Sequence, residues 1–314
     1  MRPLPQSAHN PVSSRAGSHA PSKFLTHPPS AGVGDRHPAH PDGYEAIEGY
    51  RLTSPKPEPE RRLRSITELT YGSRKFELQA GEAASTQTQI TETTLYPWRA
   101  NAFLKVNVPG KSETFLGTGW FIGPYAVATA AHVVFPREAG IYTGWASLIE
   151  VIPGLNGIVN PPPYGTFTSD NFHCPDGWQS EGDLRLDYGV VLLTQGVGSQ
   201  VGSYGFATYS DDDLNTAVGN LAGYPEYKPD GSPALGTQWY DAGSIVQVDP
   251  WFIYYDLDTQ PGESGSCVYR NIGEQRYAMA IHTAGQQGGA GSDRGLRISE
   301  PVFQNLQQWA SMQG

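Results

Sequence analysis

Short apolar segments, each bounded by turn-forming residues, run through the chain from about residue 89 onwards. They lie at residues 102–108, 114–122, 125–131, 188–193, 221–224, 243–248, 252–255, 267–269 and 277–282. Segments of this length with Gly, Pro, Asn or Asp between them are typical of β-sandwiches and β-barrels. The 37 glycines and 26 prolines supply the tight turns that such a chain needs. The sequence therefore predicts an all-β fold.

A single segment has a clear helical period. In residues 301–312, Val302, Leu306 and Trp309 recur on one face, and Pro301 lies in the first turn, where it is tolerated. We expect one C-terminal α-helix over residues 301–312.

The N-terminal part has a different composition. Residues 1–60 hold eleven of the 26 prolines and five of the eight histidines, with almost no periodic apolar pattern. Such a composition indicates disorder, and the spacing of these histidines matches no metal-ligand pair. We therefore expect residues 1–80 to be a disordered extension and residues 81–314 to be the folded domain.

Charge and hydropathy exclude two kinds of partner. Residues 81–314 carry a formal charge of −13, against +3 for residues 1–80, and an acidic body repels the phosphates of nucleic acid. No segment reaches the roughly 18–20 apolar residues of a membrane-spanning helix. In the first 40 residues the longest apolar run is Phe24-Leu25, so no secretory leader is visible. We expect neither nucleic-acid nor membrane binding.

Three segments place a reactive side chain among small or tight-turn residues. His132 follows the apolar segment 125–131, Asp187 precedes the segment 188–193, and Ser264 lies between Gly262 and Gly265. Taken alone, each also fits a bland role, as a core histidine, a strand-start acid or a plain turn. Taken together, in the order His, Asp and Ser, they fit the requirements of acyl transfer.

The chemistry assigns a role to each of the three residues. A serine hydroxyl is too weak an acid to attack a carbonyl at neutral pH, so His132 would accept its proton as general base. Asp187 would hold the imidazole in one tautomer and stabilise the imidazolium. Backbone amides of Gly262 and Ser264 would stabilise the oxyanion, a contribution of about 3–4 kcal/mol per donor.

Segments 129–134, 187–189 and 261–266 resemble the three signatures of chymotrypsin-fold serine proteases, specifically the bacterial and fungal glutamyl endopeptidase branch. Secondary matches occur at residues 89–94, 144–146, 153–154 and 163–165. The resemblance covers about residues 89–309. It implies two six-stranded antiparallel β-barrels, the first at about 89–200 and the second at about 201–300, with the active site in the cleft between them. It further implies a secreted, monomeric serine endopeptidase that acts on polypeptides without a cofactor or metal.

The resemblance also implies a substrate preference. In this branch a histidine 18 residues after the nucleophile and a threonine five residues before it bind a substrate carboxylate; those positions are His282 and Thr259. The expected preference is Glu, or Asp, before the scissile bond. Two departures from the family pattern are Cys267, where proline is usual, and Glu263 beside the nucleophile.

By the same resemblance, residues 1–80 would be a pro-segment that is cut between Arg74 and Thr88.

Three other questions stay open at this stage. Cys174 and Cys267 either pair or remain free, and residues 211–213, three consecutive acids, form a calcium site or, more in keeping with their sequence, a helix start. The alternatives to a glutamate-preferring protease are a triad protease of other specificity and a catalytically silent binding module with the same fold.

Overall fold

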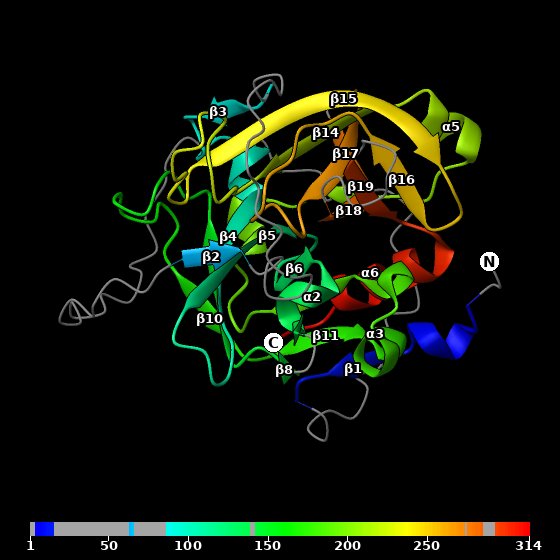
Figure 1. Ribbon diagram of the computed structural model, residues 1–314, viewed down its shortest axis with the longest axis horizontal. Helices are drawn as coiled ribbons and strands as arrows, with labels where there is room; N and C mark the ends of the chain where they lie inside the picture. Colours follow the sequence, from blue (N-terminus) through cyan, green and yellow to red (C-terminus); the bar gives the residue numbers. More distant parts are fainter. Residues whose placement is uncertain (1–3, 16–62, 66–85, 139–141, 274, 285–292) are drawn as a thin grey trace.

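The computed structural model describes residues 4–15, 63–65, 86–138, 142–273, 275–284 and 293–314. Two β-sheets make up most of this structure, and helix α6 (Glu300–Ala310) ends it (Figure 1). The predicted all-β fold with a C-terminal helix is confirmed. The predicted cleavage window, 74–88, lies mostly outside the described residues, as do the histidines at 19, 27, 37 and 40.

The first sheet carries the strand that precedes His132 and the strands that precede and follow Asp187. Its order is β1-β11-β12-β6-β5-β4-β9-β10, with β2 beside β5. Every pairing is antiparallel except that of β2 with β5. The strands are β1 (Pro11–Ser13), β2 (Leu63–Ser65), β4 (Asn101–Asn107), β5 (Thr114–Phe121), β6 (Ala126–Thr129), β9 (Leu148–Pro153), β10 (Phe167–Ser169), β11 (Phe172–Pro175) and β12 (Gly189–Leu192).

The second sheet holds Ser264 in one of its loops. Its strands β18-β17-β14-β15-β16-β19 form a closed six-stranded barrel, because β19 also pairs with β18, and closure leaves these strands no free edge. The strands are β3 (Thr88–Ile90), β13 (Gly205–Phe206), β14 (Val218–Gly223), β15 (Gln238–Val248), β16 (Phe252–Tyr255), β17 (Cys267–Ile272), β18 (Gln275–Ala284) and β19 (Asp293–Arg297).

The remaining elements are short. They are the hairpin β7 (Arg137–Glu138) and β8 (Tyr142–Thr143), the helices α2 (Ala131–Val134), α3 (Asp176–Glu181), α4 (Gly198–Val201) and α5 (Asp211–Asn215), and the 3-10 turns η1 (Gln6–His9), η2 (Trp98–Ala100) and η3 (Leu184–Leu186). Among the described residues, no helix is both long and apolar enough to cross a membrane.

The two sheets and α6 share one core. Its largest cluster joins Trp120 of the first sheet, Tyr269 and Ile281 of the second, and Leu306 and Trp309 of α6. The apolar face predicted for the C-terminal helix is therefore the face that it buries. Each large apolar side chain buried in this way stabilises the fold by about 1.5–3 kcal/mol, so the two halves are held together as one unit.

The predicted disorder of the N-terminal extension is wrong for residues 4–15. There η1 and β1 pack on the body, and β1 pairs with β11, with Val12 opposite Cys174 (Figure 1). Strand β2, within the same predicted extension, pairs with β5. Strand pairing uses backbone groups that every residue except proline carries in full, so a composition typical of disorder did not prevent it.

Two open questions are answered by the structure. Cys174 and Cys267 are free thiols, both buried, and burial raises the pKa of each well above its ordinary value. Residues 211–213 begin α5, where the Ser210 side chain caps the helix by accepting from the Asp213 amide. The described residues contain no cluster of three or more His, Cys, Asp or Glu side chains suited to a metal ion.

Candidate active site

His132 and Asp187 form a buried pair. His132 lies in α2, three residues after the end of β6, and Asp187 lies two residues before the start of β12. These two strands are paired, with Gly189 opposite Thr129. The Asp187 carboxylate accepts from the His132 backbone amide at 2.9 Å and from the ring Nδ1–H at 2.8 Å. A carboxylate that only accepts fixes the ring proton on Nδ1 and leaves Nε2 as the basic nitrogen. Sequence reasoning expected this partnership, and the structure contains it.

Gly189 is needed for this geometry. A Cβ at this position would lie 2.9 Å from the His173 carbonyl oxygen, 3.0 Å from Val134 Cγ2 and 3.5 Å from Ala131 Cα. The residue after the Asp187-Tyr188 pair must therefore be glycine for the histidine helix to approach the strand this closely. The acid and the histidine are brought together by this contact between backbones.

Ser264 lies in a buried turn between two glycines with positive φ, 101° at Gly262 and 90° at Gly265. A Cβ on Gly265 would lie 2.1 Å from Thr129 Oγ1 and 2.9 Å from the Ala130 amide nitrogen, so the serine turn abuts the end of β6. Since that strand end leads into His132, the turn that carries the predicted nucleophile packs beside the segment that carries the predicted base.

Thr118, on β5, links the serine turn to the histidine strand. Its amide donates to the Ser264 carbonyl at 2.9 Å, and its hydroxyl donates to the Gly262 carbonyl at 3.0 Å. Its own carbonyl accepts from the Thr129 hydroxyl at 2.8 Å. This buried residue therefore fixes both ends of the Gly262–Ser264 segment across the boundary between the two sheets.

Two carbonyls of the serine turn are engaged by neighbouring backbone amides. The Pro261 carbonyl accepts from the Glu226 amide at 2.6 Å, and the Glu263 carbonyl accepts from the Ser266 amide at 2.9 Å. In a trans peptide the N–H points opposite to the C=O, so the amides of Gly262 and Ser264 are directed away from these partners.

Glu263, beside the nucleophile, is a fully buried carboxyl. Its Oε2 accepts from the Gln260 amide and from the Gln87 side-chain amide, both at 2.8 Å. Gln87 is the residue directly before β3. Its hydrogen bond therefore connects the serine turn to a segment far upstream in the chain. Burial raises the pKa of Glu263 to about 8, an effect that these two hydrogen bonds only partly oppose.

This raised pKa predicts a pH dependence of stability. Between about pH 4.5 and 8 the folded protein binds a proton on Glu263 that the unfolded chain does not, so stability is highest at the acid end and falls as pH rises through about 8. In Glu263→Gln this decline should be absent. When pH is raised from about 6 to about 9, the Tm of the wild type should fall by several degrees more than the Tm of Glu263→Gln. The size follows because 1 kcal/mol shifts Tm by about 2–4 °C in a domain of this size. The control is Glu92→Gln, at an exposed glutamate, and an equal drop in all three proteins would contradict the assignment.

His282 and Thr259 lie close to the serine turn but differ in their surroundings. The His282 backbone accepts from the Gly265 amide at 2.8 Å, and its ring Nδ1 is 2.6 Å from the Tyr255 hydroxyl. Burial, followed by the nearby His132, lowers the pKa of His282 to about 3, so its imidazole is neutral. The Thr259 hydroxyl donates to the carboxylate of Asp293, which is also buried.

Thr118, Gln87 and Asp293 were not among the residues identified from sequence. Thr118 lies 146 positions before Ser264 and Gln87 lies 176 positions before Glu263, and neither has a neighbouring motif. Asp293 follows a segment outside the described residues and stands in a strand of mostly charged residues. No local signal in the sequence identifies these contacts.

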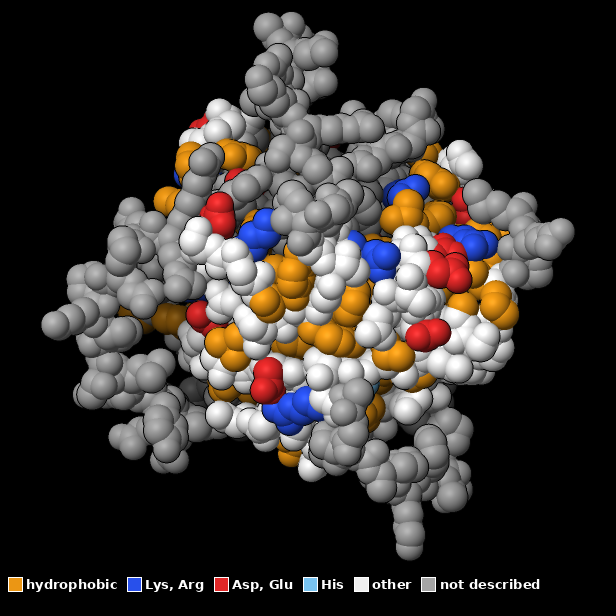
Figure 2. Space-filling model, turned by 60° about the horizontal axis from the view of Figure 1, so that its bottom comes forward, with side chains coloured by type: hydrophobic (Ala, Val, Ile, Leu, Met, Phe, Trp, Pro, Cys, Tyr) orange, Lys and Arg blue, Asp and Glu red, His pale blue; other side chains and the backbone are white. Residues whose placement is uncertain are grey.

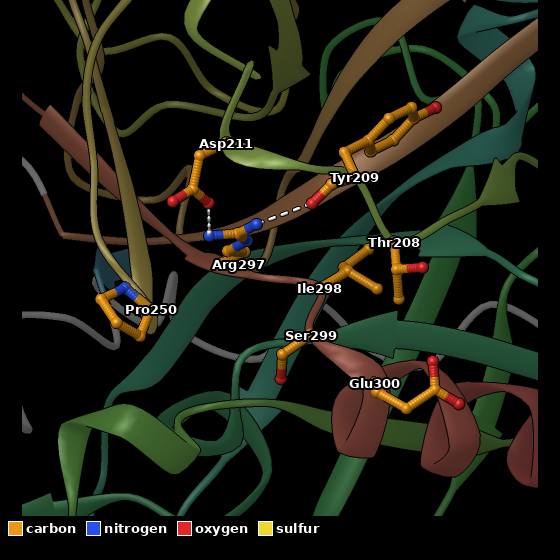
Figure 3. A pocket seen from close by; sticks show the side chains of 8 residues that line it. All are labelled: Thr208, Tyr209, Asp211, Pro250, Arg297, Ile298, Ser299 and Glu300. Atoms are coloured by element: carbon orange, nitrogen blue, oxygen red, sulfur yellow. Dashed lines mark hydrogen bonds and ion pairs between the residues drawn. The ribbon is translucent and has the colours of Figure 1, made fainter. Parts of the chain in front are cut away.

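A pocket elsewhere on the molecule contains none of the predicted site residues. It lies at the start of α6 and is lined by Thr208, Tyr209, Asp211, Pro250, Arg297, Ile298, Ser299 and Glu300 (Figure 3). The Arg297 guanidinium already donates to Asp211 Oδ1 and to the Tyr209 carbonyl, both at 2.6 Å.

On the face drawn in Figure 2, the described acidic and basic side chains are scattered singly or in small mixed groups. The described surface in that view has no extended area of one charge.

Comparison with known proteins gives relatives in sequence and in structure. Over 228 residues the chain is 35% identical to the glutamyl endopeptidase of Bacillus licheniformis, covering 71% of this chain and 66% of that protein. Over 226 residues it is 35% identical to a Bacillus subtilis protein named extracellular metalloprotease, covering 72% of this chain and 68% of that one. The chain thus spans about two thirds of the length of these relatives. No family model matches it.

The fold has solved counterparts as well. A Glu endopeptidase solved in complex with MPD superposes with a TM-score of 0.60 at 21% identity, covering 72% of this chain and 99% of that chain.

Proposed function

Because the chain belongs to the glutamyl endopeptidase branch of the chymotrypsin-fold serine proteases, we propose that it hydrolyses peptide bonds through an acyl-enzyme formed on Ser264. The observation that carries this proposal is the buried His132–Asp187 pair at the end of a strand against which the Ser264 turn packs. Thr118 supports this arrangement, since it hydrogen-bonds both to the serine turn and to Thr129, the last residue of the strand that leads to His132.

In the proposed reaction, His132 Nε2 accepts the hydroxyl proton of Ser264 as the oxygen attacks the scissile carbonyl. The resulting imidazolium is stabilised by Asp187, which stays ionised. His132 then donates its proton to the leaving amine, which departs and leaves the acyl group on Ser264. A water molecule, deprotonated by His132 in turn, hydrolyses the ester and restores the serine.

The Gly262 and Ser264 amides form the proposed oxyanion site. The orientation of the neighbouring carbonyls supports this role, since both are engaged on the opposite side of their peptides. Fixed donors stabilise the developing charge without reorganising during the reaction, which is worth about 3–4 kcal/mol per donor.

We assign the preference for Glu, or Asp, before the scissile bond to His282, with Thr259 as a second donor. If the Tyr255 hydroxyl donates to Nδ1 of the neutral ring, Nε2–H of His282 is the remaining donor, and a substrate carboxylate makes such a bond charge-assisted. Sequence similarity to a named glutamyl endopeptidase supports the same preference.

One observation favours a second candidate, a triad protease that accepts a basic residue. Asp293 is buried, and its carboxylate accepts a hydrogen bond from the Thr259 hydroxyl. The surroundings of Thr259 therefore contain an acidic group as well as a hydrogen-bond donor. An anionic side chain of the substrate would be repelled by an ionised Asp293, whereas Lys or Arg would be attracted to it. Cleavage-site profiling separates the two specificities directly.

The pocket proposal predicts the effect of His282→Ala on a library of peptides. Cleavage after Glu should fall about 10²-fold or more in kcat/KM, because the carboxylate loses its donor, while cleavage after other residues should change only a few-fold. Asp293→Asn is the matched variant and should raise cleavage after Glu by removing a like charge. Equal losses at all sites in His282→Ala, or a wild type that cleaves after Lys and Arg instead, would contradict the Glu assignment.

We further propose that the enzyme is a secreted monomer made as a zymogen, with a cut between Arg74 and Thr88. The Bacillus subtilis relative is named as an extracellular protein, which supports export of this chain. A catalytically silent binding module is the remaining alternative. It is disfavoured because no member of the proposed triad is replaced.

A further inference from the structure

Residues 4–15 occupy an edge of the first sheet through many backbone contacts. Strand β1 pairs with β11, the Ser14 amide donates to the Phe172 carbonyl at 2.9 Å, and the Asp176 amide donates to the Asn10 carbonyl at 2.8 Å. At the far end the Arg15 guanidinium forms an ion pair with Asp170. Without this segment, β11 would present its unpaired N–H and C=O groups at the sheet edge.

The same segment buries a histidine behind the proposed catalytic acid. His9 is only 5% exposed, and its ring Nδ1 lies 3.1 Å from the hydroxyl of Tyr188, the residue that follows Asp187. Asn305 of α6 donates to the His9 carbonyl at 2.7 Å and to the Tyr188 oxygen at 2.8 Å. His9, Tyr188 and Asn305 thus form one buried network that joins the N-terminal segment, the Asp187 turn and the C-terminal helix.

The hydrogen bonds of this network are compatible with a neutral His9. Because the Tyr188 oxygen accepts from Asn305, its O–H is free to donate to His9 Nδ1, which requires a neutral imidazole. Burial lowers the pKa of His9, and the nearby Asp183 opposes this effect less strongly. Burial thus favours the neutral ring, which can accept from the tyrosine.

We propose that residues 4–15 are a separable strand that stays bound to the first sheet after the chain is cut upstream of Thr86, and that His9 positions Asp187 through Tyr188. The active protein would then consist of two pieces, with the N-terminal fragment as a working part of the proteolytic domain. The positioning role rests on the proposed peptidase activity, whereas retention of the strand rests only on the proposed cut.

Retention is tested on the full chain carrying a recognition sequence for a specific protease inserted after Ala20, so that the released fragment contains residues 4–15 but not β2. After complete cutting, the N-terminal fragment should co-elute with the body in size-exclusion chromatography under native conditions and separate from it in urea, as identified by mass spectrometry. Loss of the fragment under native conditions, with unchanged Tm and peptidase activity, would overturn the proposal.

Positioning is tested in the uncut chain with His9→Ala, using Gln6→Ala, at an exposed position of the same segment, as the control. Active sites are first counted by titration with a phosphonate, and kcat is calculated per active site. It should fall about tenfold in His9→Ala with KM unchanged, because misplacing a catalytic group affects the chemical step. Tyr188→Phe should give a similar loss, and the double variant no larger one. An unchanged kcat in His9→Ala would refute the positioning role. A wild type without peptidase activity would refute the proposed function instead, while the elution experiment would still decide retention.

Discussion

Replacement of Ser264 by alanine is expected to lower kcat for a Glu-containing peptide by about 10⁴–10⁶-fold with little change in KM. The alanine variant keeps the turn and its glycines but has no oxygen to form the acyl-enzyme, so only the oxyanion site and substrate binding remain. Steady-state hydrolysis of a fluorogenic peptide measures the loss, with circular dichroism as a check that the fold is kept.

Ser266→Ala is the matched control for this variant. Ser266 lies in the same turn, and its buried hydroxyl has no hydrogen-bond partner among the described residues. Its removal should therefore change kcat only a few-fold, since no buried partner is left unsatisfied. If Ser264→Ala kept wild-type turnover, or if Ser266→Ala lost as much, Ser264 would not be the nucleophile.

Asp187→Asn is expected to lower kcat by about 10⁴-fold at neutral pH. In the wild type both carboxylate oxygens accept, one from the His132 amide and one from the ring Nδ1–H. An asparagine has only one accepting oxygen, and its amide N–H₂ facing the ring would place the imidazole proton on Nε2, the nitrogen that must be basic. The general base would then be in the wrong tautomer.

The comparison for this second prediction is Asp176→Asn, at an exposed acid that begins α3. It should alter kcat by no more than a few-fold, because its carboxylate lies outside the His132 pair. Peptide hydrolysis measured across the pH range for both variants provides the test, and a kcat within tenfold of wild type in Asp187→Asn would contradict the orienting role.

Much of the fold was predictable because the buried strands carry their own apolar pattern. Strands such as β5 and β12 are buried along their whole length, and their sequences show it as continuous apolar or small-residue runs. Strands β11 and β19 were missed, since the first contains His, Cys and Pro and the second is mostly charged. Their strand conformation comes from pairing with neighbours, which propensity does not reveal.

The candidate site divides in the same way. His132, Asp187 and Ser264 were selected from sequence because acyl transfer uses those three residue types, and the structure contains the His132–Asp187 contact and packs the serine turn against the end of β6. The contacts of Thr118 and Gln87 with the serine turn could not, because each joins backbone or side-chain groups more than 140 positions apart and follows from how the two sheets meet. Residues 4–15 were misjudged for a related reason, as their docking depends on the free edge of β11.

Mass spectrometry after reaction with a serine-directed fluorophosphonate gives the most direct test of the central claim, that His132 activates Ser264. The account predicts one adduct per molecule, on Ser264, formed rapidly in the wild type and at least about 10³-fold more slowly in His132→Ala. An adduct on a different residue, or labelling of Ser264 at the same rate in both proteins, would contradict it.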